Sequence, residues 1–221
     1  NLYSSALQLM EHFQQSGDWT AIDNAVQLME EVIKLTPDGH TEKAARLNNL
    51  GGAFFHRFEH LGSLRDIENA ILVMQQAVDL TPDGHTGKAS QLNNLGSALL
   101  ALLCRFKHLG ELGDIENAIH VMQQAVDLTP DGHADKAVQL NKLGVAFTHR
   151  FKCLDIENAI LVYQQAVDLT PDGHADKSAR LNNLGSALQS RFEHFGGKLG
   201  DIENAILVTQ QAIDLTPDGN A

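Results

Sequence analysis

The four-residue segment Thr-Pro-Asp-Gly recurs at nearly regular intervals along the chain. Its five copies are Thr36–Gly39, Thr81–Gly84, Thr129–Gly132, Thr170–Gly173 and Thr216–Gly219. Successive prolines of these copies are 45, 48, 41 and 46 residues apart. A period of this length is typical of stacked supersecondary units that bury their apolar faces against their neighbours. The sequence therefore predicts one elongated repeat domain, and such a domain usually provides a binding surface rather than a catalytic pocket.

Each repeat is predicted to contain two helices, which we name helix A and helix B. The segment from Asp66 to Leu99 is identical to the segment from Asp114 to Phe147 at 27 of 34 positions, which indicates internal duplication. We expect helix B to begin at Asp66, with this aspartate as its N-terminal cap. The Thr-Pro-Asp-Gly segment should end helix B, because proline cannot continue a helix and glycine permits a left-handed turn.

The apolar positions of both helices follow a helical period. In helix B the predicted buried stripe contains Ile67, Ala70, Ile71, Met74, Ala77 and Val78. Helix A, for example from Lys88 to about Lys107, should turn Leu92, Leu95 and Leu99 inward. A glycine recurs in the middle of helix A, although glycine costs roughly 1 kcal/mol there relative to alanine. We therefore expect two helices to approach closely at Gly51, Gly96, Gly144 and Gly185.

Five A/B pairs predict ten helices and an all-α solenoid. The repeats have the approximate bounds 1–39, 40–84, 85–132, 133–173 and 174–219. The first repeat is degenerate, and the chain begins abruptly within its predicted helix A. We therefore expect a single solenoid over 1–221 that is a fragment of a longer protein.

The bulk composition limits the class of partner. The formal net charge is −12, which argues against nucleic acid or an anionic membrane surface, because both require a positive field. A neutral or basic partner is favoured, although a solvated outer face explains the same charge. No apolar run reaches the roughly 18 residues of a membrane span. Cys104 and Cys153 are isolated rather than part of a disulfide framework, so we expect a reducing, cytoplasmic location.

The order and spacing of small and apolar residues resembles the tetratricopeptide repeat family. The positions that follow the family signature are Leu92, Leu95, Gly96, Leu99, Ala118, Met122, Ala125 and Pro130. The unit is longer than the family's usual length of about 34 residues. With its Leu-Asn-Asn-Leu-Gly segment it is similar to the kinesin-light-chain type and to repeat arrays of large fungal signalling proteins. The resemblance implies a right-handed superhelix whose concave groove, lined by the A helices, binds a peptide or protein segment without catalysis or a cofactor.

Asparagines occupy two equivalent positions of the groove face in successive A helices. The first position carries Asn48, Asn93, Asn141 and Asn182. The second position carries Asn49, Asn94, Lys142 and Asn183. Asparagine has a low helix propensity, but its donor and acceptor groups suit contact with the backbone of an extended peptide, which is the role that the resemblance implies. The alternative is a structural ladder of hydrogen bonds between adjacent A helices.

A recurrent arginine lies near the end of each of the last four A helices and is always followed by phenylalanine. The four residues are Arg57, Arg105, Arg150 and Arg191. They could form a basic rail for an acidic ligand. The alternative is that each arginine pairs with acidic residues at nearby helix ends.

The other residues of types that can bind a metal ion or catalyse a reaction also recur from repeat to repeat. One histidine follows each of the first four Thr-Pro-Asp-Gly segments, and these are His40, His85, His133 and His174. Neighbouring helices pack roughly 10 Å apart, too far for two such rings to share an ion at bonds of about 2 Å, so we expect a role in the turn and no metal. Asp114 and Glu116 also recur, which indicates helix caps rather than an acid/base pair. No nucleophile elbow or phosphate loop is present, so we expect no catalytic residue and no enzyme activity.

A second hypothesis is a structural scaffold or spacer that associates with itself. In the last helix B, the sequence predicts exposure of Ile202, Ala205, Ile206 and Ala212. Repeat ends that lack a polar cap tend to associate. End-to-end self-association within a larger fungal signalling protein is therefore the alternative to peptide binding.

Overall fold

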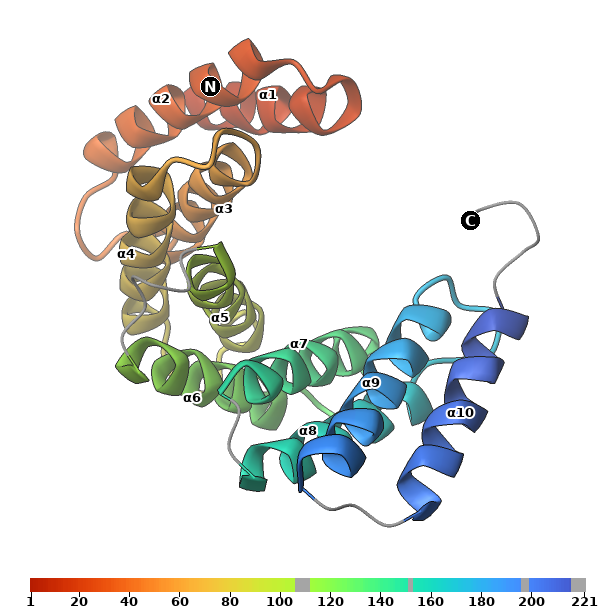
Figure 1. The fold of residues 1–221 in the computed structure, drawn as a ribbon. Helices are drawn as coiled ribbons and strands as arrows, with labels where there is room; N and C mark the ends of the chain where they lie inside the picture. Colours follow the sequence, from red (N-terminus) through yellow and green to blue (C-terminus); the bar gives the residue numbers. More distant parts are fainter. Residues whose placement is uncertain (106–111, 151–152, 196–198, 216–221) are drawn as a thin grey trace. The chain divides into compact units, whose positions relative to one another are not determined.

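The computed structural model describes residues 1–105, 112–150, 153–195 and 199–215. Within these ranges the chain forms ten α-helices and no β-strand (Figure 1). The helices are α1 (Leu2–Ser16), α2 (Trp19–Leu35), α3 (Lys43–Leu61), α4 (Leu64–Leu80), α5 (Lys88–Arg105), α6 (Leu112–Leu128), α7 (Ala134–Arg150), α8 (Cys153–Asp168), α9 (Lys177–Phe195) and α10 (Leu199–Asp214). Odd-numbered helices are the predicted A helices and even-numbered helices the B helices. The predicted all-α repeat solenoid is confirmed.

The chain divides into two compact units, unit 1 (Asn1–Val121) and unit 2 (Met122–Ala221). In unit 1, α1 packs against α2, α2 against α3, α3 against α4 and α4 against α5. In unit 2, α7 packs against α8, α8 against α9 and α9 against α10. Consecutive helices thus bury one another's apolar stripes, as a repeat solenoid requires. The five repeat bounds stay a prediction.

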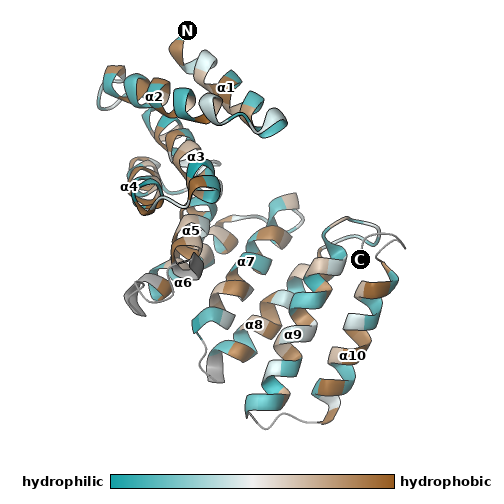
Figure 2. Ribbon diagram, turned by 45° about the horizontal axis from the view of Figure 1, so that its top comes forward, coloured by the Kyte–Doolittle hydropathy of each residue, from teal (hydrophilic) through white to brown (hydrophobic). Residues whose placement is uncertain are grey.

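The core of each unit lies between consecutive helices. In α5 the predicted inward residues Leu92, Leu95 and Leu99 are buried, and in α4 the predicted stripe is buried except for Ile71, which is half-buried. Figure 2 shows hydrophobic and hydrophilic residues alternating along individual helices, because each helix turns one side to its neighbours. The helical period read from the sequence is therefore confirmed for these two helices.

The Thr-Pro-Asp-Gly segment ends helices α2, α4, α6 and α8 as predicted. At the end of α4 the Thr81 hydroxyl donates a hydrogen bond to the carbonyl oxygen of Ala77 at 2.8 Å. Gly84 has a φ of 85°, in the left-handed region that favours glycine. The other three segments make the same threonine bond and contain a glycine with a similar φ. The fifth copy, Thr216–Gly219, lies outside the described residues.

A lysine that the sequence analysis did not identify also closes the end of helix B. The Lys88 ammonium donates hydrogen bonds to the carbonyl oxygens of Val78 and Thr81, both at 2.6 Å. Such carbonyl groups at a helix end have no intrahelical partner, and the helix dipole favours a cation there. The same two contacts are made by Lys43, Lys136 and Lys177. The signal in the sequence is a lysine six residues after each of the first four prolines.

The helix A glycines lie where helix A meets helix B, as predicted. A Cβ atom on Gly144 of α7 would lie 2.5 Å from Cε1 of Tyr163 in α8. A Cβ atom on Gly51 of α3 would lie 2.5 Å from Cγ of Met74 in α4. At Gly185 of α9 the same atom would lie 2.7 Å from a side-chain oxygen of α10. An added side chain would overlap an atom of helix B at each of the three positions, so the predicted close approach is confirmed there.

Asp66 is not an N-terminal cap, and this corrects the sequence-based prediction. Helix α4 begins at Leu64, after Ser63 in an extended conformation. Asp66 therefore lies in the first turn with 4% of its surface exposed, and its carboxylate accepts hydrogen bonds from Arg57 of α3. Asp155 of α8 and Asp201 of α10 are likewise buried in the first turn. The side chain of Asp114 lies outside the described residues, and its neighbour Glu116 is exposed within α6.

The exposed face of α10 differs from the predicted one. Ala205 and Ala212 are buried, because they face α9, and Ile202 is half-buried. Ile206 is 65% exposed, as predicted. The other large apolar residues exposed on α10 are Leu199, Leu207 and Ile213. The prediction was therefore wrong for the two alanines, since it did not separate the side of the helix that packs on α9 from the opposite side.

Candidate protein-binding surfaces

The asparagine positions form hydrogen bonds between neighbouring A helices. In unit 1 the Asn94 side chain of α5 donates to the Asn48 side chain of α3 at 3.2 Å. In unit 2 the Asn183 side chain of α9 donates to the Asn141 side chain of α7 at 3.0 Å. In both pairs a residue at the second position donates to one at the first position of the preceding A helix. The structural ladder, one of the two alternatives from the sequence, is therefore present in both units.

Tyr3 is a member of this ladder that the sequence analysis did not identify. The Asn49 side chain donates to the Tyr3 hydroxyl at 2.5 Å and so joins α3 to α1. Tyr3 takes the first position in α1, where later repeats have asparagine. The sequence of α1 differs so much from the later A helices that it does not indicate this equivalence of Tyr3 with the asparagines. The remaining predicted residues are Asn93 and Lys142, which are half-buried, and Asn182, which is exposed.

The ladder leaves part of each amide unused. In the Asn48–Asn94 pair, the NH2 group of Asn48 and the carbonyl oxygen of Asn94 bond to no other described residue. The same holds for the NH2 group of Asn141 and the carbonyl oxygen of Asn183. An asparagine side chain has two donor hydrogens and one acceptor oxygen. All four side chains are half-buried, so each pair presents one oriented donor and one oriented acceptor.

The recurrent arginines pair with carboxylates, as the second of their two alternatives proposes. Arg57 donates two hydrogen bonds to Asp66 at 3.0 and 2.6 Å, and one to Asp23 at 3.1 Å. It therefore connects α2, α3 and α4 through a bidentate ion pair and a further contact. The hydrogen bond to Asp66 contributes most to raising the pKa of Arg57 above its ordinary value.

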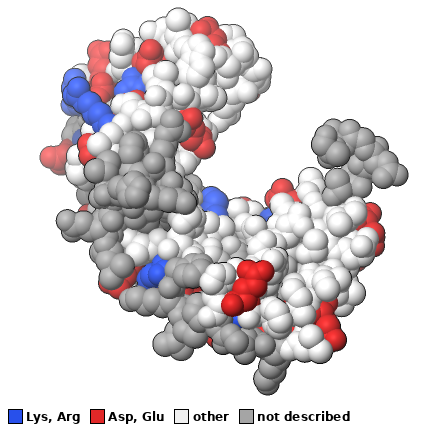
Figure 3. Space-filling view, in the orientation of Figure 1, with Lys and Arg blue, Asp and Glu red and all other residues white. Residues whose placement is uncertain are grey.

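Unit 2 repeats this arrangement. Arg191 of α9 donates to Asp201 of α10 and to Glu157 of α8, and Arg150 of α7 donates twice to Asp155 of α8. The side chain of Arg105 lies outside the described residues. Figure 3 shows Lys and Arg in small separate patches on its face, not as a continuous basic surface. The three described arginines therefore hold helices together and do not form a free basic rail.

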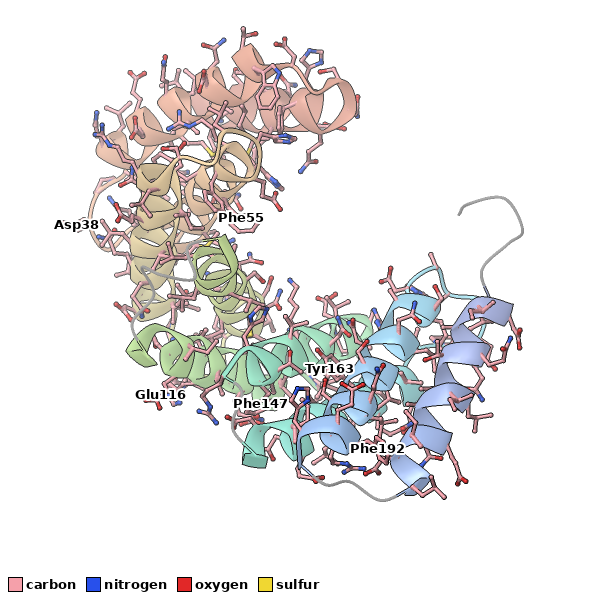
Figure 4. The ribbon with its side chains drawn as sticks, viewed as in Figure 1. Asp38, Phe55, Glu116, Phe147, Tyr163 and Phe192 are labelled. Atoms are coloured by element: carbon pink, nitrogen blue, oxygen red, sulfur yellow. The ribbon has the colours of Figure 1, made fainter. Side chains whose placement is uncertain are left out.

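A groove of about 690 Å³ lies between α6 and α8, on the B-helix side of unit 2. Its floor includes Leu140 and Phe147 of α7, which are buried. Figure 4 shows Phe147 and Tyr163 in the space shared by α7 and α8. In unit 1 a groove of about 440 Å³ lies between α2 and α4, with Phe54 and Arg57 of α3 in its floor. None of the eight predicted asparagine and lysine residues lines either groove. Sequence reasoning missed these grooves because each needs three helices to form.

The histidines have the role in the turn that the sequence predicts. The Nδ1 atom of His85 accepts a hydrogen bond from the backbone N–H of Gly87 at 3.0 Å. The other three are His40, His133 and His174, which accept the same bond from the second residue that follows. Among the described residues no group of three His, Cys, Asp or Glu side chains is placed to hold a metal ion. No helix in the described ranges is long and apolar enough to cross a membrane.

Comparison with known proteins agrees with this architecture. The family model described as a tetratricopeptide repeat matches residues 109–131. A search of curated protein sequences gives no match. One similar solved structure is a putative kinesin light chain of Podospora anserina with nearly identical TPR-like repeats. It has 17% identity and a TM-score of 0.69, and the match covers 96% of this chain and 93% of that one.

Two further structures have the same fold. MamA residues 41 to the end, from Desulfovibrio magneticus RS-1, has 18% identity and a TM-score of 0.64, with 98% of each chain covered. BtubC from P. vanneervenii has 14% identity and a TM-score of 0.60, with 100% of this chain and 92% of that one covered. The fold defines an all-α helical repeat protein. More narrowly, the fold is similar to that of the TPR-like repeat structures named above.

Proposed function

We propose that this chain is a non-catalytic module that binds a peptide or protein segment along the face of its A helices. The observation that carries the proposal is the asparagine ladder. Asn48 and Asn141 hold donors in fixed orientations, and Asn94 and Asn183 hold acceptors. The backbone of an extended peptide offers alternating N–H and C=O groups, which pair with such donors and acceptors.

The ladder and peptide binding support one another in this proposal. A free asparagine side chain on a helix loses rotamer freedom when it binds a ligand. Hydrogen bonding between adjacent helices fixes the side chain beforehand, and such preorganisation lowers the cost of binding. The hydrogen bond between Asn48 and Asn94 therefore prepares these side chains for peptide binding, so the structural role and the binding role are compatible.

A pair of isosteric substitutions tests the proposal. Asn48→Asp and Asn141→Asp keep the oxygen that accepts from Asn94 or Asn183 but remove the NH2 donor. A random peptide library is selected on the wild-type chain, and the affinities of the selected peptides are then measured for this double variant. The matched control changes the exposed B-helix residues Asn24→Asp and Asn204→Asp, which adds the same charge.

We expect the selected peptides to bind the wild type and the control alike and to bind Asn48→Asp/Asn141→Asp about tenfold more weakly. Circular dichroism of all three proteins gives the helix content, so a folding defect is recognised separately. Equal affinity for the double variant and the control would contradict the proposal.

The exposed face of α10 favours self-association as a second candidate function. Ile206 and Ile213 are 65% and 59% exposed. The residue of α4 equivalent to Ile213 is Val78, which is 7% exposed beside the next helix in the chain. The A helix of a second copy fits this face, because an A helix covers the same face of the B helices within the units.

Light scattering over a range of concentrations tests this self-association. Ile206→Glu should reduce the mass of a self-associating chain, whereas Leu72→Glu, a control on α4, should not.

A further inference from the structure

The groove between α6 and α8 combines an apolar floor with exposed apolar walls. Leu140 and Phe147 form part of the floor, and Val162 of α8 is buried beside them. On the wall, Leu161 of α8 and Leu169, the residue that follows α8, are 58% and 43% exposed. A volume of about 690 Å³ lies within the usual range of sites that bury a ligand, roughly 300–1,000 Å³. The groove can therefore take up apolar side chains of a partner.

The edges of this groove carry acidic side chains without a cationic partner among the described residues. Asp127 lies on the α6 edge and Asp168 on the α8 edge, and both are exposed. Each carboxylate accepts a hydrogen bond from a glutamine one turn earlier in its own helix, at 2.9 Å in α6 and 2.8 Å in α8. Both lie in the last turn of a helix, where the helix dipole disfavours an anion. The glutamine hydrogen bonds stabilise these turns, but each carboxylate keeps its negative charge at the unfavourable end of its helix.

The cation that lines this groove is already engaged. Lys136 donates hydrogen bonds to the carbonyl oxygens of Val126 and Thr129, both at 2.7 Å, and its ammonium lies 3.5 Å from Asp131. Asp127 and Asp168 are therefore left without compensation in a chain whose net charge is −12. The electrostatic potential at the edges of the groove attracts positive groups.

The groove of unit 1 has a different charge. Arg57 and Arg65 line it together with Asp23, Glu30 and Asp66, and Arg57 is paired with two of these carboxylates. Positive and negative side chains therefore both line this groove. The α6/α8 groove thus combines an apolar floor with acidic edges that have no cationic partner in the described part of the chain. The α2/α4 groove does not share this combination.

We propose that the α6/α8 groove binds a basic amphipathic segment of a partner protein. Apolar side chains of the segment pack on Leu140 and Phe147, and its Lys or Arg side chains pair with Asp127 and Asp168. The negative charge of the groove favours a positively charged partner segment, and the apolar floor provides the contact area. This second surface lies on the B helices and is separate from the asparagine ladder.

A pair of designed helical peptides tests the proposal. Both carry the same leucine and phenylalanine face, one has lysine on the flanking positions, and the other has glutamate. Fluorescence anisotropy measures the affinity of each peptide for the full chain at low and moderate salt. The variant is Asp127→Asn/Asp168→Asn, and the matched control is Asp79→Asn/Asp214→Asn, at the equivalent positions of α4 and α10.

We expect the lysine peptide to bind and the glutamate peptide not to bind. The Asp127→Asn/Asp168→Asn variant should bind the lysine peptide about tenfold more weakly and with a smaller dependence on salt. The control should match the wild type. A second comparison uses Leu161→Ala in the groove against Leu72→Ala, the equivalent residue of α4 with 57% exposure, and the first should weaken binding more.

Three outcomes would overturn the proposal. The first is an equal loss for the two aspartate variants, which would mean that the net charge of the chain attracts the peptide. The second is unchanged binding by Leu161→Ala. The third is self-association of the chain that Leu161→Ala removes, which would make a second copy the occupant. The Asn48→Asp/Asn141→Asp variant should bind the lysine peptide normally, so failure of this proposal and failure of ladder recognition are distinguishable.

Discussion

Units 1 and 2 are built from the same repeat, but they fill the contact between helix A and helix B differently. In unit 1 the flexible side chain of Met74 packs against Gly51. In unit 2 the aromatic ring of Tyr163 packs against Gly144. Burial raises the pKa of Tyr163 to about 12, although a hydrogen bond with Thr148 partly opposes the effect. The glycine is thus a common requirement, whereas the side chain opposite it varies.

The framework around this contact is shared by both units. Arg57 in unit 1 and Arg191 in unit 2 each connect three helices through two carboxylates. The cations that line the B-helix grooves are not shared, since Arg57 and Arg65 line the groove of unit 1 and Lys136 lines that of unit 2. The arginine contacts that hold three helices together therefore recur in both units, whereas the cations that line the two B-helix grooves differ.

Removing the arginine should have the largest effect, and a similar one in both units. Arg57→Ala leaves Asp66 buried without its cation, and Arg191→Ala does the same to Asp201. Breaking one side of a buried ion pair costs about 3 kcal/mol. Urea unfolding followed by circular dichroism measures the loss of free energy of unfolding for each variant. A loss under about 1 kcal/mol in one unit alone would show that the framework is not shared.

Tyr163 should make unit 2 sensitive to alkaline pH. The pKa of its phenol is about 12 in the folded chain and about 10 when unfolded. Because the folded pKa is higher, the neutral phenol stabilises the fold fully below about pH 10, and this contribution is lost as the pH rises to about 12. We expect a loss on the order of 2 to 3 kcal/mol that Tyr163→Phe does not show. The same pH dependence of urea unfolding in both proteins would refute this prediction.

Alanine at the two glycines should distinguish the units. Gly144→Ala places a Cβ 2.5 to 2.8 Å from three atoms of a rigid ring, and we expect a loss of about 2 kcal/mol. Gly51→Ala meets the more adaptable Met74 and should cost about 1 kcal/mol. Gly52→Ala, which meets open space, is the control and should gain up to about 1 kcal/mol. Thermal unfolding measures all three, and equal losses at Gly51 and Gly144 would contradict the comparison.

The groove carboxylates should have the smallest effect on stability. Asp127→Asn/Asp168→Asn removes two anions from the last turns of helices, so the free energy of unfolding should rise by about 0.5 kcal/mol. Chemical denaturation measures the change. A loss of more than about 1 kcal/mol would mean that these carboxylates stabilise the fold, which would remove the argument for a partner.

The period of the sequence was sufficient to predict the helices and the C-terminal ends of α2, α4, α6 and α8, but not the start of α4 at Leu64. Thr81 and Gly84 behave as the repeat implies, since a turn depends on residues close in the chain. The glycine contacts were also predictable, because glycine within a helix needs a packing reason. The lysine that closes helix B, for example Lys88, is also predictable from the sequence, because its spacing from the proline is constant.

The contacts between helices were harder to predict. The sequence alone favours a capping role for Asp66, because its partner Arg57 lies in another helix and the residues between the two helices do not reveal that the side chains meet. The burial of Ala205 depends on the position of α9, which the helical period alone does not give. The α6/α8 groove requires the packing of three helices, so no single segment of the sequence indicates it. Periodicity therefore predicts elements and their ends, but the pairing of side chains across elements needs the structure.

The most direct measurement of the central claim is a side-chain amide NMR spectrum of the chain during addition of a peptide selected on it. We expect the peptide to shift the side-chain NH2 signals of Asn48 and Asn141, because their donors face the ligand. Signals of Asn24 and Asn204 on the B helices should stay in place. Shifts confined to B-helix amides, with the ladder signals unchanged, would contradict recognition along the A helices.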